Sequence, residues 1–248
     1  MTLARRSLAG LARCLTTTTT GSLPLSADQN STRDQVRALL RETAQPVAVV
    51  TSVLYPDPSK DAPSPYHGAT LSSFTSIALD PFPLVTFSLR IPSRMATSLK
   101  SAPPHPASHM VINLLSAAQA SAAIAFSRPD LHREPFTSVS YFLSQDGVPI
   151  LEGSLGALSC RLVSRSLPLH DLELLERGLS ADKEEPSRVA AKASELFIAR
   201  VVRVEATRQR EDHESDAMWT LPLLYHRRCF TSCDIRTQHM GSTPYSVR

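Results

Sequence analysis

The stretch HGATLSSFTSIALDPFPLVTFSL, His67 to Leu89, has a high density of hydroxyl side chains for a segment with strand-like alternation. The hydroxyls belong to Thr70, Ser72, Ser73, Thr75 and Ser76. Alternation places Thr70, Ser72 and Ser76 on one face, where a buried strand would ordinarily carry Val, Ile or Leu. Asp80-Pro81 then redirects the chain before an apolar run. Because hydroxyls donate and accept hydrogen bonds without burying a charge, this face suits the polar edge of a bound heterocycle.

A second cluster of polar residues follows the apolar run. Arg90, Ser93 and Arg94 lie at the expected start of a helix over residues 93–100. Free amides, a hydroxyl and guanidinium groups together can bind a phosphate. A structural role explains the same residues, since strand-edge hydroxyls are solvated and a serine before a helix is an ordinary N-cap. Spacing alone leaves both interpretations open.

Several common kinds of site are excluded by their missing motifs. The chain has no G-x-G-x-x-G, no G-x-x-x-x-G-K-[ST], no H-E-x-x-H and no G-x-S-x-G. Its eight glycines leave little material for a phosphate-binding glycine loop. A nucleotide would therefore have to be bound by side-chain hydroxyls, arginines and strand-edge amides.

The remaining pattern predicts a mainly β chain. Strand-like segments cover residues 46–55, 68–77, 83–89, 109–115, 148–167, 194–206 and 225–230. Helix-like segments begin near Ser31-Thr32 and cover residues 93–100 and 116–126; Ser116 and Gln119 have capping-box spacing. Strands in series with irregular spacing favour a β-barrel with short peripheral helices over a βαβ array. No apolar run approaches the ~18–20 residues needed to cross a bilayer.

The first 27 residues differ from the rest of the chain. They contain Arg5, Arg6 and Arg13, nine Ser or Thr and no acidic residue. This composition is typical of a mitochondrial transit peptide, although a disordered tail has similar features. Removing the three arginines lowers the Lys plus Arg total from 26 to 23, which equals the 23 Asp plus Glu. The remaining chain is nearly neutral, which argues against nucleic-acid binding.

The order of several motifs resembles the flavin reductase-like family of FMN-binding split barrels. The motifs are A-x-P-V-A-V-V-T, the H-G-A-T-L-S-S-F-T-S-I-A-L-D-P block, S-R-M-A-T-S-L, V-I-N-L-L-S-A-A-Q and P-L-L-Y-H-R-R. The resemblance runs from about Ala44 to Phe230 and is strongest over 44–127. It implies a Greek-key split β-barrel, a homodimer with flavin at the subunit interface, FMN or FAD as cofactor, NAD(P)H as reductant and a partner oxygenase.

The resemblance also implies roles for particular residues. Four would line the isoalloxazine ring: Thr70, Ser72, Ser73 and Phe74. Thr75 and Ser76 would lie nearby, Arg90, Ser93 and Arg94 would face the phosphate, and Asn113 would belong to the flavin pocket.

One departure from the family pattern concerns the nicotinamide side. Family reductases often carry G-D-H where this chain has Lys192, Ala193 and Ser194. FMN binding is therefore better supported than NAD(P)H use. His170, in PLHDLE, either substitutes for the missing histidine or is a surface residue. A non-catalytic FMN-binding or electron-carrier protein and a flavin-free matrix scaffold remain as alternatives.

The expected organisation is a transit peptide over 1–27, the split-barrel domain over 30–230 and an irregular tail over 231–248. Near the tail, His226, Cys229, Cys233 and His239 supply zinc-type donors, but their spacing matches no standard finger. We therefore predict no metal site. The expected location is the mitochondrial matrix.

Overall fold

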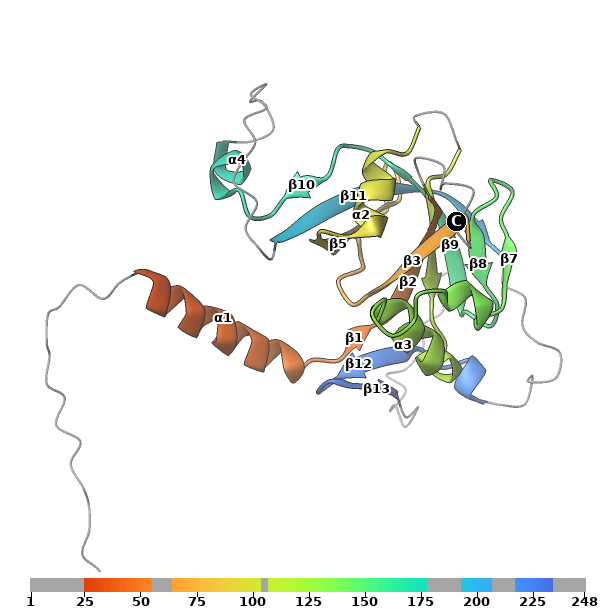
Figure 1. Ribbon diagram of the computed structural model, residues 1–248, viewed down its shortest axis with the longest axis horizontal. Coiled ribbons are helices and arrows are strands. Elements are labelled where there is room, and N and C mark those ends of the chain that lie inside the picture. Colours follow the sequence, from red (N-terminus) through yellow and green to blue (C-terminus); the bar gives the residue numbers. More distant parts are fainter. Residues whose placement is uncertain (1–24, 55–63, 104–106, 178–192, 207–216, 234–248) are drawn as a thin grey trace, which may run out of the picture. The chain divides into compact units, whose positions relative to one another are not determined.

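The computed structural model describes residues 25–54, 64–103, 107–177, 193–206 and 217–233 (Figure 1). The chain divides into two compact units, residues 1–40 and 41–248. The helix α1 (Leu25–Arg41) supplies the described part of the first unit. It begins earlier than the predicted start near Ser31-Thr32. No helix in the described ranges is both long and apolar enough to span a bilayer. The expected transit peptide lies outside these ranges, apart from the first residues of α1.

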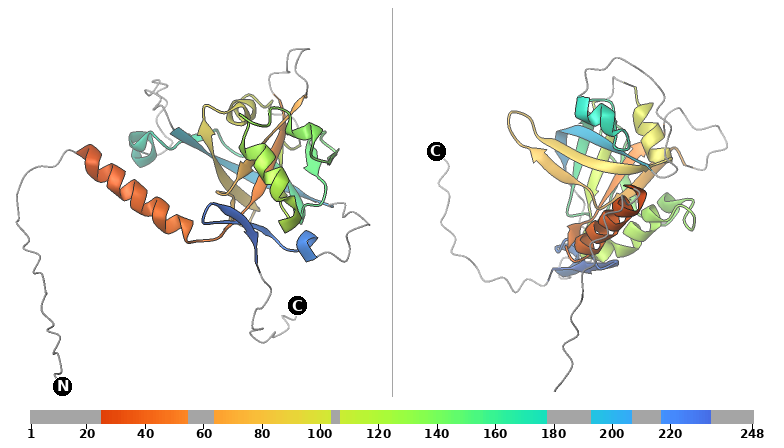
Figure 2. Two further views of the ribbon diagram at one scale, coloured as in Figure 1. Left: turned by 60° about the horizontal axis from the view of Figure 1, so that its bottom comes forward. Right: turned by 90° about the vertical axis from the view of Figure 1, so that its left-hand side faces the viewer.

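One antiparallel sheet organises the second unit. Its strands run in the order β3-β2-β6-β9-β11-β5-β4, with β10 paired to β11. Their bounds are β2 (Ala48–Val53), β3 (Tyr66–Leu71), β4 (Thr75–Ala78), β5 (Leu84–Ile91), β6 (Met110–Leu114), β9 (Gly156–Leu162), β10 (Leu167–Pro168) and β11 (Ala193–Glu205). The sheet curls so that β3 also contacts β5 (Figure 2). This confirms the predicted mainly β, barrel-like architecture.

The concave side of the sheet holds the main hydrophobic core. Phe87 of β5 and Phe197 of β11 are opposite each other in register, and their rings stack with centroids 5.5 Å apart. The helix α2 (Arg94–Lys100) buries Met95 and Leu99 in the same cluster. Full burial of an aliphatic or aromatic side chain contributes about 1.5–3 kcal/mol. The core therefore fixes β5, β11 and α2 relative to one another.

The convex side of β2 and β3 packs against a second cluster. It is covered by η1 (Ala117–Gln119), α3 (Ala120–Ser127) and η2 (Pro135–Thr137). Gly68 of β3 makes this approach possible, because a Cβ there would lie 2.7 Å from the Phe126 ring. The Ser116–Gln119 capping box is present before α3, as predicted. A hairpin of β7 (Tyr141–Leu143) and β8 (Pro149–Leu151) lies beside it.

A small sheet completes the second unit. It joins β1 (Gln45–Pro46), β12 (Leu223–His226) and β13 (Cys229–Ser232) in the order β1-β12-β13. The short helices α4 (Leu172–Arg177) and η4 (Ala217–Trp219) lie between the strands in sequence.

Two strand predictions were wrong in detail. The expected strand over 68–77 is interrupted at residues 72–74, between β3 and β4. The expected strand over 225–230 is a hairpin, because Arg227 and Arg228 adopt left-handed φ values of 49° and 67° and reverse the chain. Such a turn usually carries Gly or Asn, and two arginines at these positions do not predict it.

The C-terminal His and Cys residues that the structure describes do not form a cluster that could bind a metal ion. His226 pairs with Cys229 across the β12–β13 hairpin, and Cys229 and Cys233 are exposed free thiols. His239 lies outside the described residues. Among the residues that are described, no group of three or more His, Cys, Asp or Glu could hold a metal ion.

Candidate functional site

The break between β3 and β4 is held in place by a serine. The Ser73 hydroxyl donates to the Ser88 carbonyl at 3.2 Å and accepts from the Ser88 amide at 2.9 Å. One side chain thus occupies both hydrogen-bonding groups of a β5 residue. The neighbouring Phe74 is partly buried against the main core. These contacts fix the connecting segment beside β5 although it belongs to neither strand.

Three hydroxyl residues of the quoted stretch remain open to solvent. Ser72, Thr75 and Ser76 are exposed. Among the described residues, the Thr75 hydroxyl donates a hydrogen bond to the neighbouring Ser76 carbonyl alone, at 3.2 Å. The Ser72 hydroxyl has no hydrogen-bond partner among the described residues. These three residues, predicted to lie at or near the isoalloxazine ring, are therefore accessible to a ligand.

Thr70 lies apart from these exposed hydroxyls. Its hydroxyl donates to the Ala123 carbonyl of α3 at 2.7 Å. The interaction uses the face of β3 that α3 covers, so it also secures the helix to the sheet. The structure therefore shows a structural hydrogen bond for Thr70, and its role beside the flavin ring stays a prediction.

The predicted phosphate-binding residues lie where β5 ends and α2 begins. Arg90 is two residues beyond Ser88 on β5, so both side chains lie on one face of the strand. Ser93 caps α2 by accepting from the Ala96 amide at 3.3 Å. Arg90 and Arg94 are exposed, and neither forms an ion pair with a described residue. The strand to which Ser73 bonds therefore carries Arg90, and the helix that follows this strand begins with Arg94.

Asn113 is fully buried and belongs to a different environment. Its amide nitrogen donates to the Val49 carbonyl at 3.1 Å and to the Thr51 hydroxyl at 3.2 Å. Its amide oxygen accepts from the Leu151 amide at 2.8 Å. Asn113 therefore joins β2, β6 and β8, and its place in a flavin pocket stays a prediction.

The start of β11 lies next to Arg90. Ser194 is its register partner, and the Leu169 amide donates to the Ser194 carbonyl at 2.9 Å. This places His170 near the position where the family motif predicted a histidine. His170 is half-buried, and its Nδ1 is buried without a hydrogen-bond partner among the described residues. Of the three aligned residues, Lys192 lies outside the described ranges.

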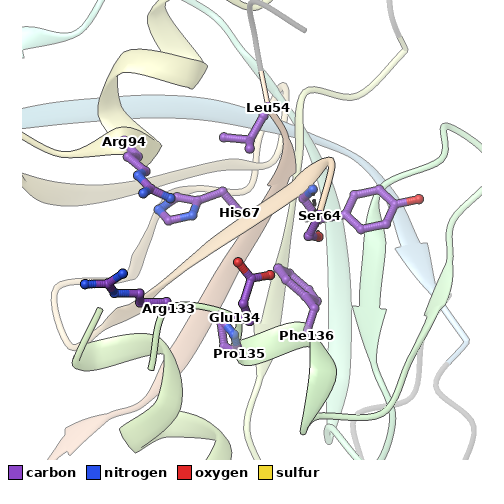
Figure 3. Close-up of a pocket in the computed structure, with 9 residues that line it drawn as sticks. Leu54, Ser64, His67, Arg94, Arg133, Glu134, Pro135 and Phe136 are labelled. Carbon is purple, nitrogen blue, oxygen red and sulfur yellow. Dashed lines mark hydrogen bonds between the residues drawn. The ribbon is translucent and has the colours of Figure 1, made fainter. Parts of the chain in front are cut away.

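A small pocket near the start of β3 was not predicted from the sequence. Figure 3 shows His67 beside Arg94, with Arg133 and Glu134 entering from the segment after α3. The pocket volume is about 50 Å³. Burial, and then the nearby Arg94 charge, lower the pKa of His67 from 6.5 to about 4. The His67 ring is therefore neutral at pH 7. His67 and Arg94 lie in motifs noted in the sequence, whereas Arg133 and Glu134 come from a segment without a motif.

Comparison with known proteins identifies relatives of the chain. Residues 40–234 match the family model described as "Flavin reductase like domain". A flavin reductase from Pseudomonas putida is 32% identical over 128 residues, 52% of this chain and 66% of that protein. The FMN reductase (NADH) SmoA from Agrobacterium fabrum is 34% identical over 98 residues, 38% of this chain and 49% of SmoA. The alignments thus span less than two thirds of either relative.

The likeness extends to solved structures. The styrene monooxygenase flavin reductase SMOB from Pseudomonas putida S12 superposes with a TM-score of 0.56 and 23% identity, over 82% of this chain and 99% of that chain. At this identity the match concerns the fold.

The Ser73–Ser88 contact leads to a stability prediction. Ser73→Ala should lower the free energy of unfolding by about 1–3 kcal/mol, because it removes two hydrogen bonds and leaves a strand residue unpaired. The matched variant Ser72→Ala should change it by less than about 0.5 kcal/mol, since Ser72 is exposed and its hydroxyl has no partner in the described part of the chain. Urea denaturation of both variants checks this. Equal effects would mean that Ser73 does not hold the segment.

Proposed function

Because the chain belongs to the flavin reductase-like family, we propose that it reduces a bound flavin with NAD(P)H. The observation that carries the proposal is the hydroxyl segment over 72–76, held against β5, the strand that carries Arg90; neither Arg90 nor Arg94 has an ion-pair partner among the described residues. When bound, the flavin supplies the redox chemistry by accepting a hydride. The protein supplies the binding groups and their orientation.

The residues fit a flavin with a phosphate. The open hydroxyl of Ser72 can serve the polar edge of the ring, because it can donate or accept a hydrogen bond. Arg90 and Arg94 can form charge-assisted hydrogen bonds with the phosphate. FMN is the smallest flavin that has this phosphate, and the name of SmoA assigns FMN and NADH to that relative. We therefore propose FMN as a sufficient cofactor and NADH as the reductant.

His170 is the candidate residue on the nicotinamide side. It lies next to the Ser194–Arg90 row of the sheet, and its buried Nδ1 has no partner among the described residues. A buried ring nitrogen without a partner is costly unless a ligand or water satisfies it. We propose that His170 orients the reduced nicotinamide and so takes the place of the absent G-D-H histidine.

The hydroxyl segment also lies at an apolar free edge of the sheet. In β4 and the following turn, the exposed fractions of Ile77, Leu79 and Phe82 are 49%, 72% and 49%. Free sheet edges with exposed apolar residues tend to pair with another chain. We propose that this edge forms a homodimer interface which covers the flavin site. Leu79→Asp should then shift full-length protein from dimer to monomer in sedimentation velocity, and a monomeric unmutated protein would contradict the interface.

We also propose that the protein acts in the mitochondrial matrix, on the strength of its arginine- and hydroxyl-rich first 27 residues. A fluorescent fusion of residues 1–30 should enter mitochondria, and replacing its three arginines with Glu should prevent entry. Cytosolic fluorescence from the unmutated fusion would reject this location.

A partner oxygenase is the proposed acceptor of reduced flavin. The name of SMOB links that protein to a styrene monooxygenase. Exposed binding residues in this chain are compatible with flavin exchange. Reduced flavin that stays with the protein through anaerobic gel filtration would contradict transfer by diffusion.

Two variants separate flavin binding from reduction. Ser72→Val should weaken FMN binding by ~1–3 kcal/mol, because the valine adds bulk and removes a hydrogen-bond partner. His170→Ala should leave FMN affinity unchanged and raise the KM for NADH. The measurements are fluorescence titration with FMN and steady-state NADH oxidation.

The outcomes distinguish the candidate functions. Unchanged FMN affinity in Ser72→Val would place the ring elsewhere. FMN binding without any NADH oxidation by the unmutated protein would instead identify a non-catalytic flavin-binding protein.

A further inference from the structure

One charged residue lies among the buried positions of β11. Alternate residues of this strand are buried, and Glu195 is in phase with Ala193, Phe197 and Ala199. The side chain of Glu195 is 9% exposed. Burial of a carboxylate costs free energy unless ion pairs or hydrogen bonds compensate for it. The position of Glu195 therefore depends on its polar partners.

The two carboxylate oxygens of Glu195 bond to two different parts of the chain. Lys100, at the end of α2, donates to Oε1 at 2.9 Å, and the Ser166 hydroxyl, just before β10, donates to Oε2 at 2.9 Å. A buried ion pair adds little net stability compared with apolar side chains of similar volume. The more specific effect of this arrangement is geometric, because it fixes Ser166 at a defined place beside β11.

The segment around Ser166 has few other attachments. None of residues 163–171 is buried, and β10 pairs with β11 through two residues. One backbone hydrogen bond to β11 precedes β10, from the Val163 amide, and one follows it, from the Leu169 amide. A pairing without a buried face specifies its register weakly. The side-chain bond to Glu195 is therefore an important determinant of the register of β10.

This register decides where the His170 ring lies. A slip of one residue exchanges the two faces of a paired strand, and His170 follows β10 by two residues. Its Nδ1 is buried without a hydrogen-bond partner among the described residues, so the ring has an enclosed place that a slip would remove. The Ser166–Glu195 bond opposes such a slip, because it joins the residue before β10 to a side chain of β11.

We propose that Glu195 is a positioning residue for His170 and acts through Ser166. Lys100 balances the buried charge, the carboxylate fixes the Ser166 hydroxyl, and the register of β10 then places the imidazole. The inference rests on the proposed function, in which His170 orients the reduced nicotinamide. In this role Glu195 affects the reaction only through the position of His170.

Ser166→Ala tests the contact directly, because it leaves the Lys100–Glu195 pair in place, whereas Glu195→Ala would also leave Lys100 unpaired. In full-length, FMN-loaded protein, Ser166→Ala should raise the KM for NADH roughly fivefold, the effect of one lost hydrogen bond, and should change kcat and FMN affinity by less than about twofold. Ser166→Thr restores the hydroxyl and should restore the KM. Steady-state NADH oxidation and FMN fluorescence titration measure these quantities.

A double variant shows whether the effect passes through the histidine. If Ser166 acts by placing His170, Ser166→Ala should not raise the KM further in a His170→Ala background, whereas independent effects would multiply. Multiplied effects would overturn the inference. The matched control is Ser164→Ala, which removes a hydroxyl from the same segment, where it bonds to the adjacent Arg165 carbonyl at 3.1 Å. This control should leave the KM unchanged.

The position of His170 can also be measured by NMR in cofactor-free protein. The ring resonance of His170, assigned through its loss in His170→Ala, should shift in Ser166→Ala and return in Ser166→Thr. An unmoved resonance, or an unchanged KM, would overturn the inference and leave the proposed function standing. FMN binding without NADH oxidation by the unmutated protein would instead overturn the proposed function, while the resonance would still show whether Ser166 places the histidine.

Discussion

The Ser73 hydroxyl takes the place of backbone pairing where the chain between β3 and β4 is not a strand. By donating to and accepting from the backbone of Ser88, it gives the segment after β3 a fixed position beside β5. The segment therefore keeps a fixed position although the neighbouring hydroxyls are exposed to solvent. Since Arg90 follows Ser88 on the same strand, this single contact also sets the distance between the hydroxyls and the guanidinium groups.

Both faces of β3 are packed along most of the strand, since Ala69 and Leu71 on the face away from α3 belong to the main core. Toward α3, Thr70 bonds to the helix and Gly68 admits the Phe126 ring, so this face is closed by packing. At the start of the strand, His67 lies beside Arg94 in an open pocket. The hydroxyl segment follows the other end of β3, about 17 Å away for five residues of strand. Arg94 lines this pocket and also belongs to the cluster proposed to hold the flavin phosphate.

Local patterns in the sequence predicted much of this arrangement. Capping spacing predicted the Ser116–Gln119 box, and alternation predicted most strands of the sheet. The break at residues 72–74 was missed because it depends on a hydrogen bond to Ser88, fifteen residues further along. The same limit applies to Asn113, whose partners come from distant strands, and to the pocket, where Arg133 and His67 meet only in the fold.

The central claim is that the protein binds a flavin and reduces it with a nicotinamide nucleotide. The most direct test is the visible absorbance spectrum of the protein, loaded with FMN and then mixed anaerobically with NADH. If the protein binds and reduces flavin, the flavin band should be perturbed on binding and should then bleach as NADH is consumed in equal amount. A spectrum identical to free FMN, or a bound flavin that stays oxidised with either NADH or NADPH, would contradict it.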